Sequence, residues 1–322
     1  MSKLFPRCQI TPQADHQVSI QIDGDEKARW HYGPQYPRPF FFPFNGPSGR
    51  TLTRMGHPGA SNHDHHRSVW FAHAKVLGID FWSDNTDAQI RQKHWLVYES
   101  GDERAILATR LGWYDGHEPK ELLDQVVVAI FRPGPDGETL LELQSTFHPT
   151  SDSIEFQQSN FGFLAVRVAA SISENFGDGH LTNSEGLVGE KLESGKPNIF
   201  GKRAGWMDYS GPTMPASENP DPNSPAGDVV EGITYFDHPQ NPGFPNHWHV
   251  REDGWMGASP CMQGPLQTTK ANPLRVRFLL HAHAGPINSK RASEIAEQFA
   301  AWPVFDVIRS GKSHQQYEIR EA

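Results

Sequence analysis

The sequence predicts an all-β protein built as a sandwich or barrel of antiparallel strands. Apolar and polar residues alternate with period two in many segments, which is the pattern of half-buried strands. Only one segment has helical spacing, so helices do not alternate with strands as a parallel α/β sheet requires. The 29 glycines and 26 prolines also disfavour long helical bundles.

The predicted strands are spread over most of the chain. They are Gln17–Ile22, His94–Glu99, Arg104–Trp113, Leu122–Phe131, Thr139–Phe147, Phe161–Ile172 and Leu274–His283. The turn residues Arg132–Gly137 connect two of them as a hairpin. Val126–Phe131 is apolar throughout, which is typical of a strand covered on both faces.

One segment near the end of the chain is predicted to be a helix. In Ala292–Trp302 the residues Ile295, Phe299 and Trp302 lie on one stripe, and Ser293 is the expected N-cap. No change of composition divides the chain, so residues 1–322 are expected to form one β-sandwich domain. Residues 211–227 are expected to be a long loop that borders the functional site and moves more than the sheets.

Composition excludes several classes of function. The chain has 29 basic and 38 acidic residues, a net charge of −9, so we expect no nucleic-acid partner. No apolar stretch is long enough to span a membrane, and the first residues lack a secretory h-region. The two cysteines, Cys8 and Cys261, suit a reducing compartment, so a cytoplasmic location is expected. No phosphate-binding loop is present, so no nucleotide cofactor is expected.

The densest group of candidate functional residues lies between residues 57 and 70. It holds His63, His65 and His66 beside Arg67. If a strand begins at His65, then His63 and His65 share one face and His66 lies on the other. Imidazoles on one face suit a metal ion, whereas the arginine suits a carboxylate or a sugar hydroxyl. The alternative is a polar loop whose histidines cap turns.

A second group lies between residues 237 and 251. His247 and His249 flank a tryptophan and precede Arg251, and three prolines stiffen the approach to them. A third pair, His281 and His283, ends a predicted strand on same-facing positions, where a solvated polar face is an equally good explanation.

Aromatic and acidic residues accompany these groups. Tryptophans beside polar side chains suit sugars, whose C–H faces stack on rings. The aromatic residues concerned are Trp70, Phe71, Phe81, Trp82, Trp206, Tyr209, Trp248 and Trp255. The carboxylates available for acid–base work are Asp64, Asp80, Asp84, Glu185, Asp208, Glu231 and Asp237.

Several blocks of sequence together resemble one known family. They are RPFFFPFNGPSGR (38–50), Thr53–Arg54, HDHHR (63–67), WFAH (70–73), GIDFW (78–82), NSEG (183–186), WMDYSG (206–211), GITYFDHP (232–239) and WHVR (248–251). They are similar to bacterial proteins of unknown function that carry the label "methane oxygenase PmoA". Typical members read HPHHRG where this chain has His63–Ser68 as HDHHRS, so a serine stands where the family has glycine.

The resemblance implies a fold and a metabolic setting. The implied fold is a large antiparallel supersandwich, similar to galactose mutarotase, with few short helices. Members are common beside sugar dehydrogenases and sugar isomerases in carbohydrate-degrading bacteria, which implies a role in sugar catabolism. The membrane subunit of methane monooxygenase is an integral membrane protein, whereas this chain has no segment of that kind, so the label does not guide the expected function.

Three functions remain open from the sequence. The first is an enzyme that hydrolyses, eliminates or epimerises a small carbohydrate. Its expected catalytic residues are His65, His66, His249, Asp208 and Glu185, and its expected substrate-binding residues are Arg67, Arg251, Trp82, Trp206, His238 and Asn241. The second is an oxygenase or lyase that uses a divalent metal, with His63, His65 and His247 as ligands. The third is a carbohydrate-binding protein without catalysis.

The clustering of titratable residues favours an enzyme over a binding protein, because a stacking platform needs few imidazoles. We therefore expect the two histidine blocks, 63–67 and 247–251, to converge on one concave site. Trp82, Trp206 and Asp208 are expected to lie near it. The sequence leaves the substrate, the reaction and the oligomeric state open.

Overall fold

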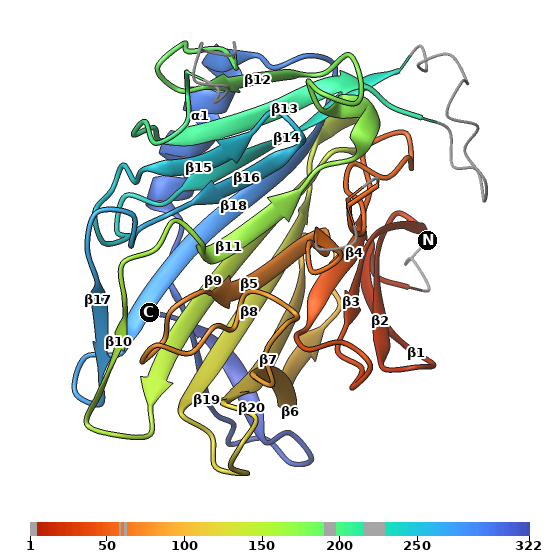
Figure 1. Ribbon diagram of the computed structural model, residues 1–322. Helices are drawn as coiled ribbons and strands as arrows, with labels where there is room; N and C mark the ends of the chain where they lie inside the picture. The colour runs from red at the N-terminus through yellow and green to blue at the C-terminus, as the bar shows by residue number, and fades with distance from the viewer. Residues whose placement is uncertain (1–4, 58, 61–62, 190–197, 215–228) are drawn as a thin grey trace.

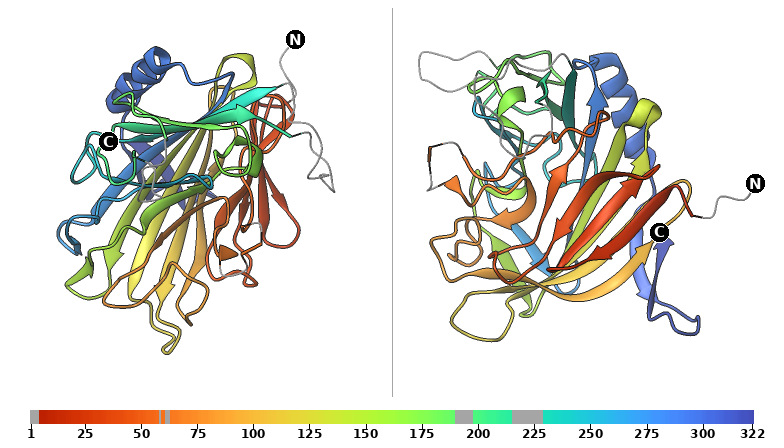
Figure 2. Two further views of the ribbon diagram at one scale, coloured as in Figure 1. Left: turned by 45° about the horizontal axis from the view of Figure 1, so that its top comes forward. Right: turned by 90° about the vertical axis from the view of Figure 1, so that its right-hand side faces the viewer.

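Two large antiparallel sheets stacked face to face form the body of the protein (Figures 1 and 2). The computed structural model describes residues 5–57, 59–60, 63–189, 198–214 and 229–322. Strands dominate these residues, and the predicted all-β sandwich is confirmed. None of the helices in this described part has the length and apolar character that crossing a bilayer requires.

The first sheet contains eight strands, and the candidate site lies on its outer face. Its order is β1-β2-β3-β4-β5-β11-β16-β15, with β15 at the edge. The bounds are β1 (Cys8–Gln13), β2 (Gln17–Ile22), β3 (Asp25–His31), β4 (Phe40–Phe44), β5 (Val69–His73), β11 (Gly162–Arg167), β15 (Trp248–Arg251) and β16 (Trp255–Ala258).

The second sheet also contains eight strands, which are mostly longer. Its order is β12-β13-β14-β18-β9-β8-β7-β6. The bounds are β6 (Gln89–Glu99), β7 (Ala105–Tyr114), β8 (Leu123–Pro133), β9 (Thr139–Pro149), β12 (His180–Asn183), β13 (Trp206–Pro212), β14 (Val230–Asp237) and β18 (Leu274–Ala284). Two small sheets pair β10 (Ser153–Phe156) with β17 (Leu266–Thr269) and β19 (Phe305–Arg309) with β20 (Tyr317–Glu321).

The main core lies between the two sheets. Side chains alternate along each strand, so every second residue points inward and meets the facing sheet. Tyr235 of β14 and Trp248 of β15 bring their ring centroids to 4.8 Å, and Phe41 and Phe131 to 5.8 Å. Burial of these large rings supplies the main driving force that holds the sheets together.

Four predicted strands of the second sheet lie within two residues of β7, β8, β9 and β18, whereas β6 begins five residues before the predicted start at His94. The predicted strand Phe161–Ile172 is too long, because β11 ends at Arg167 and residues 170–172 form the 3₁₀ turn η3 (Ala170–Ile172). Residues 135–137 form another, η2 (Pro135–Gly137). The short strands of the first sheet, including β15 and β16, are too brief for a periodic pattern to reveal.

The α-helix α1 (Ser289–Ala301) begins earlier than predicted. Its N-cap is Asn288 rather than Ser293, because the Asn288 side chain accepts a hydrogen bond from the backbone N–H of Arg291 at 3.0 Å. The predicted apolar stripe is confirmed: Ile295 and Phe299 pack with Trp206 on the outer face of the second sheet, and Trp302 packs beside Phe299.

Most of the predicted loop at 211–227 lies outside the described residues, since the structure does not describe 215–228. The ends that are described belong to the second sheet, where Pro212 pairs with Val230 and the N–H of Thr213 donates to the carbonyl of Val229.

Candidate functional site

A wide cleft opens on the outer face of the first sheet, with a volume of about 1090 Å³. Its floor contains Trp82 and Trp255, and Trp70 packs against both. The three ring centroids lie 5.2 to 5.6 Å apart. Trp70 and Trp255 point outward because their strand neighbours Val69 and Met256 point into the main core.

The histidine loop between β4 and β5 forms one wall of the cleft. His57, His63, His65 and His66 all line it. Their rings are in contact, with centroids 4.2 Å apart for His65 and His66 and 5.3 Å apart for His57 and His63. The predicted strand beginning at His65 is wrong, because the N–H of His66 donates to the carbonyl of His63 in a turn. The turn brings all of these imidazoles to one side.

Ser68 stands at the position where the resemblance implies a glycine, and its backbone has a φ of +56°. This left-handed conformation favours glycine, so the serine adopts the turn with some strain. Its hydroxyl lies 2.7 Å from the hydroxyl of Thr53 in the buried base of the loop. The turn therefore forms without the glycine.

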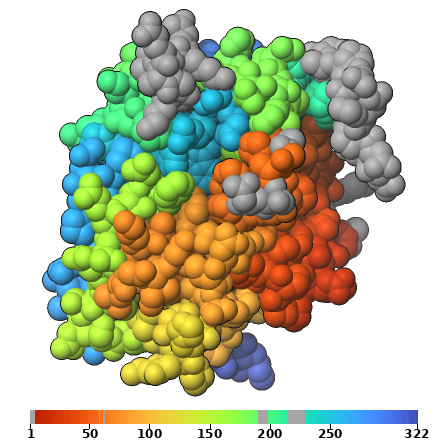
Figure 3. All heavy atoms as spheres, viewed as in Figure 1, coloured from red at the N-terminus to blue at the C-terminus, as the bar shows by residue number. Residues whose placement is uncertain are grey.

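The second wall comes from the hairpin of β15 and β16 and from the segment before β11. His249 and Arg251 line the cleft from alternate positions of β15, and Phe161 packs against His249 with ring centroids 4.8 Å apart. Figure 3 shows this face, with the orange surface of residues 63–80 near the cyan surface of the later strands. His63, His65 and His66 of the first block and His249 and Arg251 of the second therefore line one concave surface, which is part of the predicted set.

A chain of polar contacts joins the two walls. His57 Nε2 lies 3.2 Å from Asp253 Oδ2, and Asp253 accepts hydrogen bonds from Arg167 at 2.8 and 3.0 Å. Burial raises the pKa of Asp253, but the Arg167 guanidinium lowers it more, so this pKa lies below its usual value. Asp253 is therefore a fixed carboxylate that orients the His57 ring.

Within the described residues, several ring nitrogen atoms in and beneath the cleft lack a hydrogen-bond partner. They are the indole Nε1 of Trp70, Trp82 and Trp255 and the Nδ1 of His63 and His66. These atoms are buried, so leaving them unpaired costs free energy. Such groups are common where a bound molecule or water completes the hydrogen bonds.

Burial also keeps two of the imidazoles uncharged. It lowers the pKa of His66, and the neighbouring His65 and Arg167 lower it further. Burial likewise lowers the pKa of His63, with His57 and Arg167 adding to the effect. At neutral pH these rings are neutral, so each carries one N–H donor and one acceptor nitrogen.

Two residues expected at the site have other partners. Arg67 forms an ion pair with Asp84, which also binds Arg38, and does not line the cleft. His247 does not line it either, and its Nδ1 lies 2.8 Å from the carbonyl oxygen of Gly201. The expected ligands His63, His65 and His247 are therefore not together. Across the described residues, no group of three or more His, Cys, Asp or Glu is placed to hold a metal ion.

Trp206, Asp208 and Glu185 were expected near the site, and this expectation is wrong. Trp206 and Asp208 lie on β13 in the other sheet, on its outer face. Asp208 accepts hydrogen bonds from Thr234 at 2.8 Å and from His283 at 2.9 Å. Glu185 is exposed in a turn after β12. None of the three lines the cleft.

His238 and Asn241 belong to a buried network that holds the second sheet to the end of the chain. The Asn241 side chain donates to Asp237 at 2.7 Å and to the carbonyl of Arg277 at 2.6 Å. His238 Nε2 lies 3.0 Å from Arg277, and burial together with this positive charge lowers the pKa of His238 to about 4. These contacts stabilise the fold, and neither His238 nor Asn241 lines the cleft.

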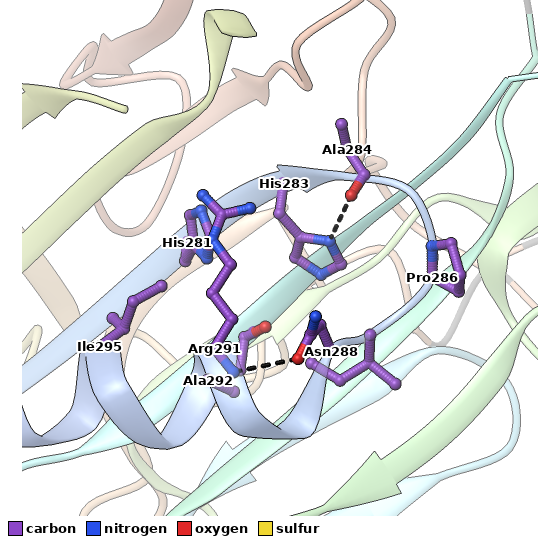
Figure 4. Close-up of a pocket in the computed structure, with 10 residues that line it drawn as sticks. His281, His283, Ala284, Pro286, Asn288, Arg291, Ala292 and Ile295 are labelled. Carbon is purple, nitrogen blue, oxygen red and sulfur yellow. Dashed lines mark hydrogen bonds between the residues drawn. The ribbon is translucent and has the colours of Figure 1, made fainter. Parts of the chain in front are cut away.

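The third histidine pair lies beneath α1. His281 binds Glu138 at 2.9 Å, and Arg291 of α1 binds the same carboxylate. Figure 4 shows His281, His283 and Arg291 around a small cavity there, whose volume of about 20 Å³ holds roughly one water molecule. Glu138 therefore fastens the helix to the second sheet, and this cavity is too small for a sugar.

Replacing Glu138 by glutamine is expected to lower the free energy of unfolding by about 3 kcal/mol at pH 7. Burial raises the pKa of Glu138, but hydrogen bonds from His281 and Arg291 lower it to about 2 from 4.5. A lowered pKa stabilises the fold above pH 4.5, and this contribution is lost as the pH falls towards 2. Urea unfolding at pH 7 and pH 3 measures both effects.

The matched control is Glu294→Gln, since Glu294 is exposed on α1 and pairs with the exposed Lys290 at 3.9 Å. We expect that change to cost less than about 0.5 kcal/mol at either pH. A Glu138→Gln effect that is equally small, or that does not shrink at low pH, would contradict the structural role.

Sequence reasoning missed the groups that link the two walls. Arg167 is a lone charge inside the apolar run FGFLAVRVAA, and this pattern was the available signal for a buried ion pair. Asp253 follows the WHVR block closely, but its partner His57 is far away in the sequence. Only the fold reveals that they meet.

The fold and the cleft define the class of protein: an antiparallel β-sandwich with a histidine-rich cleft on the outer face of one sheet. Residues 17–297 match a family of unknown function (DUF6807), and the chain belongs to this family. The expected membership in a family without an assigned function is thereby confirmed, whereas the PmoA label stays a prediction.

Two further comparisons complete this description. No curated protein sequence matches the chain. Solved structures similar to it include a GalM/aldose epimerase homologue from C. elegans, with a TM-score of 0.32 and 8% identity, covering 87% of this chain and 100% of that one. Another is a 4-alpha-glucanotransferase from Thermococcus litoralis, with a TM-score of 0.33 and 10% identity, covering 87% of this chain and 40% of that one.

Proposed function

We propose that this protein is an enzyme that transfers protons on a carbohydrate, in an epimerisation or an elimination. The observation that carries the proposal is the composition of the cleft: several imidazoles in contact with an indole floor whose N–H groups have no partner among the described residues. Indole faces suit the C–H faces of a sugar, and these N–H donors suit its oxygens.

The carboxylates of the cleft favour this chemistry over glycoside hydrolysis. Hydrolysis uses two carboxylates, one as acid and one as base or nucleophile. Asp253 is held by Arg167 and His57. Asp80 accepts hydrogen bonds from the backbone N–H groups of Trp82 and Ser83 and from the hydroxyl of Ser83. These two carboxylates serve to position other groups, which leaves Glu252 as the third carboxylate that lines the cleft, one fewer than hydrolysis uses. The imidazoles are then the better proton carriers.

The proposed reaction begins at a carbon next to a carbonyl group of the sugar. His57, oriented by Asp253, removes the proton from that carbon, and the carbonyl oxygen becomes an enolate oxygen. The proposal assigns the stabilisation of this negative charge to the indole N–H groups of Trp82 and Trp255, which are buried in the floor without a partner among the described residues. His249, from the second wall, returns a proton to the carbon in epimerisation, or protonates the leaving oxygen on the neighbouring carbon in elimination.

Solvent exchange tests this proposal whichever product forms. The protein is incubated in D₂O with aldoses, ketoses, keto-glycosides and uronic acids, and NMR follows the replacement of C–H by C–D. We expect exchange in at least one sugar, followed by an epimer or an unsaturated product. His249→Ala should abolish the product while deuterium exchange by His57 continues, and the exposed His117→Ala should change neither.

Two other outcomes separate the alternatives. Binding of a sugar without any exchange or product would favour a carbohydrate-binding protein. Release of a sugar from a glycoside without deuterium at carbon would favour hydrolysis. Either result would contradict the proposed proton transfer at carbon.

A further inference from the structure

We propose that the substrate contains at least two sugar units and that the second unit binds in a groove beside the cleft. This inference rests on the proposed function, because it names the class of carbohydrate on which the same site acts. The groove has a volume of about 550 Å³ and shares Lys75, Ser159 and Asn160 with the cleft. The two hollows are therefore continuous along one face.

The size of the cleft supports the inference. Drug-sized ligands occupy pockets of roughly 300–1,000 Å³. The cleft alone has about 1090 Å³, and the side groove extends it. A single sugar ring is smaller than such ligands and would leave most of this space to water.

The lining of the side groove suits an uncharged sugar. Beyond the three shared residues it contains Glu155, Gln157, Gln158, Met262 and Pro265. Two amides are fixed in place, since Gln157 accepts a hydrogen bond from the N–H of Gly78 at 2.6 Å and Gln158 donates to the carbonyl of Met262 at 3.0 Å. Lys75 and Glu155 offset each other in charge. Preorganised amides with little net charge match hydroxyl groups better than a carboxylate or phosphate.

Phe161 stands where the cleft and the side groove meet. It follows Asn160 in the chain, contacts Trp82 and His249 with ring centroids 5.3 and 4.8 Å away, and is 38% exposed. A partly exposed phenylalanine ring in the lining of the cleft offers an apolar face on which a sugar ring can stack. A sugar ring stacked on its open face would be held next to the reacting unit. Phe161 is thus a specificity residue rather than a catalytic one.

Paired sugars of one and two units test the inference. Quenching of tryptophan fluorescence measures the affinity for glucose, xylose, galactose and mannose and for disaccharides of each. We expect at least one disaccharide to bind ten-fold or more tightly than its monosaccharide. Phe161→Ala and Gln158→Ala should each reduce that preference several-fold. In turnover of Gln158→Ala, whose side chain lines the side groove and not the cleft, KM for the disaccharide should rise while kcat stays within about two-fold.

The control is Tyr98→Ala, which removes an aromatic residue that is 55% exposed on β6 of the other sheet. It should leave the preference unchanged. Equal affinity and turnover for one and two units would overturn the inference while leaving the proposed function intact. Failure of every sugar to bind or exchange would overturn the proposed function, and the inference with it. If Gln158→Ala and Phe161→Ala keep the wild-type preference for the disaccharide, the second unit binds elsewhere, and the inference is overturned.

Discussion

Replacing His57 by alanine is expected to slow deuterium exchange into the substrate by about two to four orders of magnitude, the usual contribution of a general base. A carboxylate orients the ring of His57, since its Nε2 lies 3.2 Å from Asp253. It lines the cleft beside His63, so its loss removes the proton acceptor and leaves the floor of tryptophans in place. The exchange rate at saturating substrate measures the effect.

The fold should tolerate this change. His57 belongs to a surface loop and its side chain is 15% exposed, so the melting temperature should shift by only a few degrees. The exposed His117→Ala serves as the matched control and should keep the full rate. Exchange at the wild-type rate in His57→Ala would remove this residue from the mechanism. Loss of the folded state in that variant would instead show that the loop holds the sheet together.

Replacing Asp253 by asparagine is expected to lower the free energy of unfolding by about 3 to 5 kcal/mol. The Arg167 side chain is 1% exposed, and Asp253 is its bidentate partner at 2.8 and 3.0 Å. The substitution keeps the size of the side chain but removes its charge. A buried guanidinium is then left without a counter-charge, which costs far more than a lost surface ion pair.

Chemical unfolding at pH 7 checks this prediction, with Asp152→Asn as the matched control. Asp152 is fully exposed and pairs with the exposed Lys270 at 3.3 Å, so we expect that change to cost less than about 0.5 kcal/mol. Similar costs for both variants would show that solvent screens Arg167. We also expect Asp253→Asn to lower the exchange rate, because His57 loses its orienting partner.

The long strands of the second sheet could be predicted from sequence, and the first sheet mostly could not. β9 and β18 have eleven residues each, enough for the alternation to stand out. β15 and β16 have four residues each, which is too few to distinguish a strand from a loop. The pairing of β5 with β11 joins segments far apart in the sequence, and no local pattern reports it.

The candidate site was predictable in its residue types but not in its partners. The two histidine blocks are visible as motifs, and they do meet. Trp206 and Asp208 also combine a tryptophan with a polar side chain in one motif, yet they lie on the other sheet. Alternation shows that a side chain faces outward, but it does not show which of two sheets it covers. Assignment of a residue to a sheet needs the long-range pairing.

The tight turn between β15 and β16 sets a limit on how this protein can change during evolution. Three residues, 252–254, connect the strands, and Gly254 has a φ of +91°, with Val168 so close that a Cβ atom would lie 2.8 Å from it. Arg251, at the end of β15, and Asp253, in the turn, keep their places only at this length. Insertion or deletion of a single residue would separate Asp253 from Arg167 and His57 without harming the rest of the sheet. The length of this turn therefore distinguishes related chains that keep the site from those that keep only the fold.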